Sequence, residues 1–365
     1  MARDHPLIPV LELSGTPAQI GAAHGEAQRS RIREYVDRFL GWLLHTAAVP
    51  LTEKALWAAW APQVAVNRSE APALVEEMHG IARGAGVPFE RIFLLNSFWD
   101  LNSLRYLRTA QNFVGCSTFA VVAEAGSGKT LVGQTYDVRG EYQESYLALL
   151  RLRPAQGPRQ LVFTFAGVVG AAGLNEAGIA VNINYLSARD VGLGRLHSVV
   201  VRQILAAGQL ADALAPPVVP PRAGGAHFLI AERGGHVVSI ETAAKRHRVF
   251  YPARNAIGHT NHYLAGALRK VEFIRPGSIG SSLARYTALR RYLQDQDGRL
   301  TMASLQELTR NHTAFPYSIC AHGADSEPAG NRTRTVSAMV QVPADQTVHL
   351  TSGCACEANY HPVDL

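Results

Sequence analysis

Through the first third of the chain, apolar residues recur at the spacing of one helical face. The first such stripe covers 20–44, with arginine and glutamate at the positions between, and a second begins after Ser69. Gly84 or Gly86 is placed to end the second helix, and 88–107 has the composition of a third. The pattern therefore predicts a helical N-terminal segment.

At Val114 the pattern changes to short segments rich in β-branched residues, separated by turns rich in glycine and asparagine. The segments STFAVVAE and KTLVGQTYDV, joined by AGSG, predict a hairpin. Further strands are expected in YLALLRLR, RQLVFTFAG, LNEAGIAVNIN, AHFLIAE and HVVSIET, and a last hairpin in RTVSAMVQVP with TVHLTSG. Helices are predicted at 198–214 and 281–294, whereas the proline-rich stretch 215–225 is predicted to be neither helix nor central strand.

Helices followed by blocks of strands indicate an α+β protein built on antiparallel sheets, with layers of sheet covered by helices. Hydrophobic residues make up 47% and charged residues 18% of the 365 positions, which is typical of a globular protein with a large core. This length does not decide between one domain and two. No apolar run approaches the roughly eighteen residues of a membrane span, and the start lacks the pattern of a secretion signal. A cytoplasmic location and no membrane partner are therefore expected.

The net charge of +6 comes almost entirely from arginine, since lysine occurs only at Lys54, Lys129, Lys245 and Lys270. A general preference for arginine in the source is the simplest explanation, although a positive field would also favour an anionic substrate. The chain has no basic run with interleaved aromatic residues, so nucleic acid is not expected as a partner.

The four cysteines, Cys116, Cys320, Cys354 and Cys356, are too few and too unevenly spread for a disulfide framework. A single residue separates Cys354 from Cys356, which is closer than the spacing usual in zinc sites. With His361 these two could complete a metal cluster, but ordinary reduced cysteines are the preferred interpretation. No metal site is predicted.

The segment AEAGSGKT at 123–130 resembles the phosphate-binding loop G-x-x-x-x-G-K-[ST]. Ala123 replaces its first glycine, and the following LVGQTYDV predicts a strand where that motif needs a helix. A turn is therefore expected here, and nucleotide hydrolysis is disfavoured.

Cys116 follows Gly115 at the start of the first predicted strand. A cysteine in such a place is commonly a small buried hydrophobe. The alternative is a self-cleaving nucleophile, because glycine tolerates the sharp backbone bend that forms when a thiol attacks the preceding carbonyl. Cleavage between Gly115 and Cys116 would free an α-amine, which titrates near neutrality and can act as the base for its own thiol.

The segment GCSTFAVV, followed by GQTYD at 133–137, resembles the acyl-coenzyme A:6-aminopenicillanic acid acyltransferase (isopenicillin N acyltransferase) family of N-terminal nucleophile hydrolases. Penicillin V acylases and bile salt hydrolases are related families. The resemblance continues over nearly the whole chain, through ELSGTPAQIGAAHGE, EEMHGIARGAGV, GLNEAGIAVNINY, HFLIAE, SIET, GHTNHY, SSLARY, YSICAH and TRTVSAMV. It implies an αββα sandwich of two antiparallel sheets between helical layers, with a helical N-terminal pro-segment.

The resemblance also implies roles for individual residues. Cys116 would be the nucleophile, Asp137 would bind the freed α-amine, and the side-chain amide of Asn261 would donate to an oxyanion. Asn184 matches a second oxyanion or substrate contact, and Arg285 matches an arginine near the nucleophile of the hydrolase relatives. Taken alone, Asp137 could be a turn or surface carboxylate, Asn261 a turn cap, and Arg285 a solvated helix residue.

Gln134 stands where the bile salt hydrolases have an arginine, and glutamine at this position resembles the acyltransferase branch. Thr335 and Ser337 resemble a hydroxyl-bearing segment near the acyl-binding region, and neither is assigned a catalytic role.

The function implied is a self-cleaving acyltransferase that moves an acyl group from a thioester or amide to an amine through a Cys116 acyl-enzyme. If acyl-coenzyme A is the acyl donor, it would be a substrate, and no cofactor is expected. The alternatives are an amidohydrolase with water as acceptor, penicillin V acylase-like or acting on N-acyl amides, and an uncleaved binding protein on the same fold. Fragments 1–115 and 116–365 would stay together as one composite domain; a homo-oligomer is left open.

Overall fold

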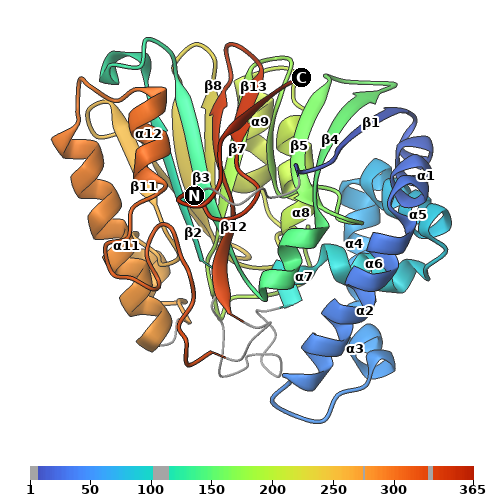
Figure 1. The fold of residues 1–365 in the computed structure, drawn as a ribbon. Helices are drawn as coiled ribbons and strands as arrows, with labels where there is room; N and C mark the ends of the chain where they lie inside the picture. Colours follow the sequence, from blue (N-terminus) through green and yellow to red (C-terminus); the bar gives the residue numbers. More distant parts are fainter. Residues whose placement is uncertain (1–6, 102–114, 274–275, 328–331) are drawn as a thin grey trace.

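Two β-sheets lie face to face, with helices outside each of them, in a computed structural model of the chain (Figure 1). The structure describes residues 7–101, 115–273, 276–327 and 332–365. The α+β class and the αββα arrangement are therefore as predicted.

The larger sheet has eight strands in the order β1-β4-β5-β6-β7-β8-β9-β10. Their bounds are β1 Val10–Gly15, β4 Leu147–Pro154, β5 Gln160–Phe165, β6 Ala172–Asn175, β7 Ile179–Tyr185, β8 Ala226–Glu232, β9 Val237–Thr242 and β10 His247–Phe250. Strand β1 pairs with β4 in parallel, and the other pairs are antiparallel. The first third of the chain thus contributes an edge strand as well as helices, which the helical prediction missed (Figure 1).

The smaller sheet has six strands in the order β11-β2-β3-β12-β13-β14, all paired antiparallel. Their bounds are β11 Ala256–His259, β2 Gly115–Val121, β3 Leu131–Arg139, β12 Thr333–Val342, β13 Thr347–Leu350 and β14 His361–Asp364. The predicted hairpins β2–β3 and β12–β13 are confirmed. A turn at 123–128 leads into β3, so the strand expected after AGSGKT is confirmed as well.

Helices cover the outer faces of both sheets. Those before β2 are α1 Pro17–Ala27, α2 Arg29–His45, α3 Glu53–Trp60, α4 Pro62–Glu70, α5 Pro72–Ala85, α6 Phe89–Asn96 and α7 Phe98–Leu101; the later ones are α8 His197–Leu205, α9 Leu210–Val218, α10 Gly266–Arg269, α11 Pro276–Asp295 and α12 Met302–Leu308. Helices α8 and α9 pack on the larger sheet, and α11 and α12 pack on the smaller one (Figure 1). No helix in the described ranges is long and apolar enough to cross a membrane.

Several predicted helices differ from the observed ones. The stripe over 20–44 is divided at Gln28 into α1 and α2, and 198–214 is divided between α8 and α9. Helix α9 also continues through Pro216 and Pro217, although the composition of the proline-rich stretch predicts a non-helical segment. Both prolines lie in the last turn, and Pro217 is buried. Each removes an N–H that would donate to the preceding turn, and the helix ends directly after them, at Val218. Residues 102–107 of the third predicted helix lie outside the described residues.

Helices α1 and α5 cross at unusually close range. A Cβ on Gly21 would lie 2.0 Å from the Glu77 carbonyl oxygen, and one on Gly84 would lie 2.2 Å from that of Ala22. Only glycine allows the two backbones to approach this closely. Gly21 in ELSGTPAQIGAAHGE and Gly84 in EEMHGIARGAGV therefore have a packing role.

One large apolar cluster fills the space between the sheets and continues under the N-terminal helices. It joins Ile32, Phe39 and Leu95, before the predicted cleavage point, to Phe163 and Met339 after it. Burial of this shared core would oppose separation of the two parts without any covalent link.

Candidate active site

Cys116 is the second residue of β2 and lies buried between the sheets, opposite Tyr136 of β3. Gly115, the residue before it, is paired with Asp137. A Cβ on Gly115 would lie 2.7 Å from Oδ2 of Asp137, so a larger residue here would displace that carboxylate. The two residues of the predicted cleavage site thus sit directly beside the predicted acidic residue.

Three side chains hold the backbone of Cys116. Its N–H donates to Oδ1 of Asn261 at 2.9 Å. Its carbonyl oxygen accepts from Nδ2 of Asn184 and from Nη1 of Arg285, both at 2.8 Å. These residues come from β7, from α11 and from the loop after β11, and together with Asp137 they bring every predicted site residue to one place.

The contacts of Asn261 fix the orientation of its amide. Oδ1 accepts from the Cys116 N–H and also from Nη2 of Arg285 at 2.8 Å. Nδ2 donates to the carbonyl oxygen of Tyr185 at 3.0 Å, and the Asn261 N–H donates to Oγ of Ser282 at 2.8 Å. This side chain therefore accepts from the Cys116 backbone, and one Nδ2 hydrogen remains as a further donor.

Asn184 is oriented by a chain of hydrogen bonds behind it. Its Oδ1 accepts from Oγ1 of Thr118 at 2.7 Å and lies 2.6 Å from Nδ1 of His227. Burial, together with the neighbouring His259, holds the pKa of His227 well below its usual range, so the ring is neutral. Since Oδ1 only accepts, Nδ1 carries the proton, and Nε2 accepts from Oγ of Ser239 at 2.8 Å. This arrangement turns the Asn184 amide nitrogen toward Cys116.

The charged groups of the site are Arg285 and Asp137, and both are buried. Burial raises the pKa of Asp137 to about 7, against the opposing effects of the Arg285 charge and of a 2.6 Å hydrogen bond from Oγ1 of Thr335. Burial likewise lowers the pKa of Arg285, opposed by Asp137 and Cys116. Asp137 thus titrates near neutrality, where a general base is most effective.

The thiol of Cys116 is held in its protonated form. Burial raises its pKa to about 12, and the Asp137 charge contributes in the same direction. The backbone N–H of Asp137, the side chain of Gln134 and the charge of Arg285 act in the opposite direction. Because the thiolate is the reactive species, this thiol needs a base to take its proton.

Sequence reasoning missed the residues that position the predicted ones. They are Thr118, His227, Ser282 and Thr335. All four lie within segments that resemble the family's, and Thr335 is singled out there only as part of a hydroxyl-bearing segment. No periodicity or spacing marks a side chain that acts through a neighbour. The sequence distinguishes Gln134 only by its type; in the fold it spans the two sheets, with Nε2 donating to the Ile183 carbonyl at 2.8 Å and Oε1 accepting from the Ile183 N–H at 3.2 Å.

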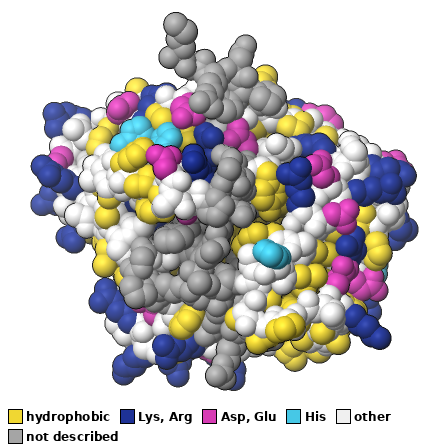
Figure 2. Space-filling view, turned by 60° about the horizontal axis from the view of Figure 1, so that its bottom comes forward, with side chains coloured by type: hydrophobic (Ala, Val, Ile, Leu, Met, Phe, Trp, Pro, Cys, Tyr) yellow, Lys and Arg dark blue, Asp and Glu magenta, His cyan; other side chains and the backbone are white. Residues whose placement is uncertain are grey.

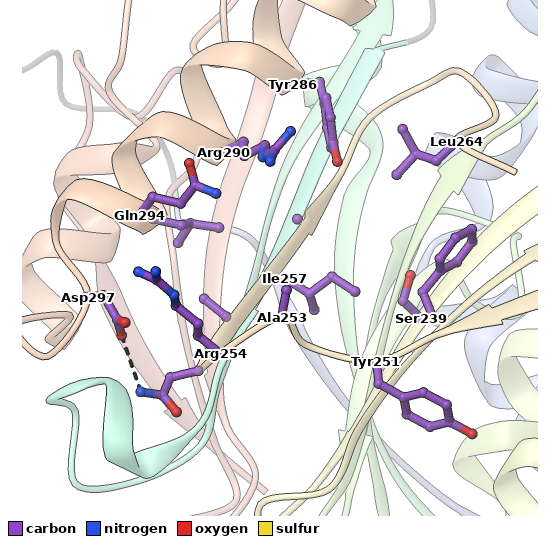
Figure 3. Close-up of a pocket in the computed structure, with 15 residues that line it drawn as sticks. Ser239, Tyr251, Ala253, Arg254, Ile257, Leu264, Tyr286, Arg290, Gln294 and Asp297 are labelled. Carbon is purple, nitrogen blue, oxygen red and sulfur yellow. Dashed lines mark hydrogen bonds between the residues drawn. The ribbon is translucent and has the colours of Figure 1, made fainter.

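A small pocket adjoins this centre, and a larger one is lined by other residues. The small one, of about 30 Å³, lies beside Gly115, Asp137 and Asn261, which is room for about one water molecule. The larger one, of about 360 Å³, opens between β10, β11 and α11, and Figure 3 shows Tyr286, Arg290 and Ile257 around it. Ser239 lines this larger pocket, so the hydrogen-bond chain through His227 and Asn184 links it to Cys116.

Charged side chains are distributed unevenly on one face of the molecule. On the face turned forward in Figure 2, lysine and arginine side chains lie in separate groups around the periphery, with acidic side chains between them. Such interspersed charge does not form the basic stripe typical of a nucleic-acid interface.

Comparison with known proteins identifies relatives of one kind. The model of the family described as acyl-coenzyme A:6-aminopenicillanic acid acyl-transferase matches residues 124–354. The acyl-coenzyme A:6-aminopenicillanic-acid-acyltransferase 40 kDa form of Emericella nidulans is 26% identical over 319 residues, 87% of this chain and 85% of that protein. Protein dcd1A of Dictyostelium discoideum is 27% identical over 135 residues, 32% of this chain and 29% of that protein.

Solved structures show distant likenesses. An N-acylethanolamine-hydrolyzing acid amidase ortholog of Caenorhabditis elegans has a TM-score of 0.46 at 15% identity, covering 63% of this chain and 93% of its own. Penicillin V acylase from Agrobacterium tumefaciens has a TM-score of 0.45 at 12% identity, covering 68% and 86%. The assignment rests on the family match, which spans more than half of the sequence: the chain belongs to the acyl-coenzyme A:6-aminopenicillanic acid acyl-transferase family and is an enzyme of this acyl-transfer type.

Proposed function

We propose that this chain cuts itself between Gly115 and Cys116, and that the freed Cys116 then carries acyl groups from a thioester or amide to an amine. The observation that carries the proposal is the set of contacts on Cys116. A buried thiol directly after a glycine has its N–H and carbonyl fixed by Asn261, Asn184 and Arg285, beside a carboxyl that titrates near neutrality.

The self-cleavage step needs a base other than the α-amine. In the uninterrupted chain the Cys116 nitrogen is an amide that donates to Asn261, so it cannot take the thiol proton. Asp137, with its pKa raised to about 7, is the base that lies next to the scissile pair. Sγ then attacks the Gly115 carbonyl carbon, the C–N bond breaks and its nitrogen takes a proton. Water hydrolyses the resulting thioester, which leaves a carboxylate on Gly115 and an amine and thiol on Cys116.

In the cut enzyme, the α-amine of Cys116 becomes the base for its own thiol. Asn261 Oδ1 is already placed to accept from this nitrogen, and Asp137 can balance its charge. Sγ attacks the donor carbonyl, and the remaining Nδ2 hydrogen of Asn261 donates to the oxyanion. The leaving group departs with the proton, and an amine or water then releases the acyl group from the sulfur.

The larger pocket is our candidate for the acyl group. Its walls carry Phe250, Ile257, Leu264 and Leu293, which suit a hydrocarbon or aromatic chain. Arg290 also lines it, so a polar or anionic end would be tolerated. The pocket would therefore favour amphiphilic acyl groups.

Intact-mass analysis of the purified protein tests the cleavage. We expect two fragments, 1–115 and 116–365, that co-purify without a disulfide, whereas Cys116→Ala stays whole and inactive. Cys354→Ala is the matched control, and it should be cut like the wild type. A wild-type protein that is active while whole, or that is cut elsewhere, would overturn the proposal.

Competition between acceptors separates transfer from hydrolysis. The purified enzyme is given an acyl thioester and increasing amounts of a primary amine, and amide and free acid are measured together. Diversion of product from acid to amide supports the transferase. If amines never divert the acyl group, the chain is an amidohydrolase with the same nucleophile.

A further inference from the structure

Two loops far from each other in sequence bring together two imidazoles and two thiols. His312, Cys320 and His322 lie in the loop between α12 and β12, and Cys356 lies between β13 and β14. One ligand atom from each of the four residues lies within 4.8 Å of those of the other three. All four cysteines of the chain are unpaired.

Four of the six separations between ligand atoms in this cluster are close to those of a tetrahedron around one ion, and the other two are within 4.8 Å. Nε2 of His322 lies 3.0 Å from Nε2 of His312, 3.3 Å from Sγ of Cys356 and 3.7 Å from Sγ of Cys320, and the two sulfurs are 3.6 Å apart. Zinc–sulfur bonds of about 2.3 Å and zinc–nitrogen bonds of about 2.0 Å place tetrahedral ligands roughly 3.3–3.8 Å apart. The observed distances fall in or close to this range before any ion is considered.

We propose that His312, Cys320, His322 and Cys356 bind a single zinc ion. Two thiolates and two imidazoles form a donor set that favours tetrahedral zinc over hard cations such as magnesium or calcium. Two thiolates also neutralise the ion's charge. Since four protein ligands close the coordination shell, this is a structural site and has no part in the acyl chemistry.

Neighbouring charges support the ligands. Nδ1 of His322 faces Oε1 of Glu357 at 3.6 Å, and a carboxylate behind a ligating histidine orients its ring and selects the tautomer. Nη2 of Arg334 donates to Oε2 of the same glutamate at 3.1 Å. Cys354 is not one of the four clustered ligands, although its thiol lies beside Cys320. It accepts from Nη2 of Arg334 at 3.3 Å and also contacts the carbonyl oxygens of Thr335 and Ala321, at 3.2 and 3.5 Å.

The position of the cluster gives the ion a task. Ala321 lies between two of the ligands, and its N–H donates to Oγ1 of Thr335 at 2.8 Å. Thr335 in turn donates to Asp137 at 2.6 Å and returns its own N–H to the Ala321 carbonyl at 2.9 Å. Ala321 also lines the small pocket beside Gly115. Zinc would therefore fasten the loop that holds Asp137 in place.

Spacing along the sequence draws attention to a different set. It singles out Cys354, Cys356 and His361, and only Cys356 belongs to the cluster. His361 lies exposed on β14. The ligands on the α12–β12 loop could not be found from spacing, because the fold alone brings this loop beside Cys356.

Metal analysis of the full-length protein tests the site. Protein grown with added zinc and freed of loose metal by gel filtration should hold about one zinc ion per chain by elemental mass spectrometry. Cys356→Ala and His312→Ala should each lose most of it. Cys354→Ala and His361→Ala are the matched controls, and both should keep it. Cobalt loaded in place of zinc should give the thiolate-to-metal absorption of a tetrahedral site, weakened in Cys356→Ala.

The outcomes that would overturn the proposal are distinct from failure of the acyl chemistry, since metal content is measured without substrate. Wild-type protein without stoichiometric metal, or metal retained by the Cys356→Ala/His312→Ala double variant, would refute the site. An unreduced protein two mass units lighter, with Cys320 joined to Cys356, would replace it with a disulfide. Because His312 and Cys356 are exposed, their replacement should leave the fold intact, and circular dichroism can establish that these variants are folded.

Discussion

The two thiol centres of this protein differ in the groups gathered around the cysteine. Around Cys116 stand a carboxyl, a guanidinium and two side-chain amides, and burial raises the pKa of its thiol to about 12. Around Cys320 and Cys356 stand two imidazoles, at distances that suit one shared ion. Burial keeps a proton on the Cys116 sulfur until a base removes it, whereas the second set suits two thiolates that a cation neutralises. The neighbours, and not the residue type, decide what a cysteine can do.

The centres are also connected. Ala321, between two of the proposed zinc ligands, is hydrogen-bonded to Thr335, which donates to Asp137. A substitution or metal loss at one centre is therefore expected to have a smaller effect at the other centre, and the predictions run from the largest effect to the smallest.

The largest effect is expected from Arg285→Ala. It removes a buried cation that contacts the Cys116 carbonyl, Oγ of Ser117 and Oδ1 of Asn261, and leaves Asp137 without its opposing charge. Self-cleavage and acyl transfer should each fall about 10²–10³-fold, as on loss of a preorganised electrostatic partner. Gel densitometry of the uncut band and initial rates measure the two losses. Arg291→Ala, on the same helix but exposed, should leave both unchanged.

A smaller loss is expected from Gly115→Ala, which tests the contact at the cleavage site. The new Cβ would lie 2.7 Å from Oδ2 of Asp137, so the carboxylate or β2 must move. A displacement of this order at a reacting centre costs about 10²-fold in rate. The uncut fraction after a fixed time measures it, with Gly41→Ala, where a Cβ meets open space, as the control. Cleavage at the wild-type rate would show that the approach of Asp137 is not needed.

The comparison of the centres also shows what a sequence can reveal. The Cys116 centre could be predicted because its parts lie in contiguous segments that resemble a family, so each residue had a motif to identify it. The sheets and most strands followed from alternation and turn residues. Strand β1 and the helical course of Pro216 and Pro217 did not, because packing against distant elements decides them.

The imidazole–thiol cluster could not be predicted for the same reason. Its members span from His312 to Cys356, and their spacing resembles no metal motif. Likewise, nothing local distinguishes His227 or Thr335 from ordinary buried polar residues. Their roles depend on hydrogen bonds to Asn184 and Asp137, which only the folded chain brings within reach.

Thr335→Val tests the connection between the centres through pH. The hydroxyl of Thr335 lowers the pKa of Asp137, so its loss should raise that pKa further above about 7. If Asp137 is the base of self-cleavage, the wild-type rate rises with pH through about 7 and levels off above it. In the variant this rise should move to higher pH, with a nearly unchanged plateau. If the substitution makes Asp137 a tenfold weaker acid, the variant should cleave itself about tenfold more slowly than the wild type at any pH below both pKa values. A profile identical to the wild type's would remove Asp137 from the role of base.

The smallest effect is expected from removing zinc from enzyme that is already cut. The loop around Ala321 would loosen while β12 still holds Thr335, so acyl transfer should fall only about two- to threefold, an energy of about 0.5 kcal/mol. The midpoint of thermal unfolding should fall as well, because zinc binds the folded state alone. Thr335→Val should abolish the effect of chelation on rate but keep its effect on unfolding, since the hydroxyl is the proposed link and not a ligand. If chelation lowered the acyl-transfer rate equally in the variant and the wild type, the ion would act on the active site by another route. The two thiol centres would then be coupled through more of the sheet than this one contact.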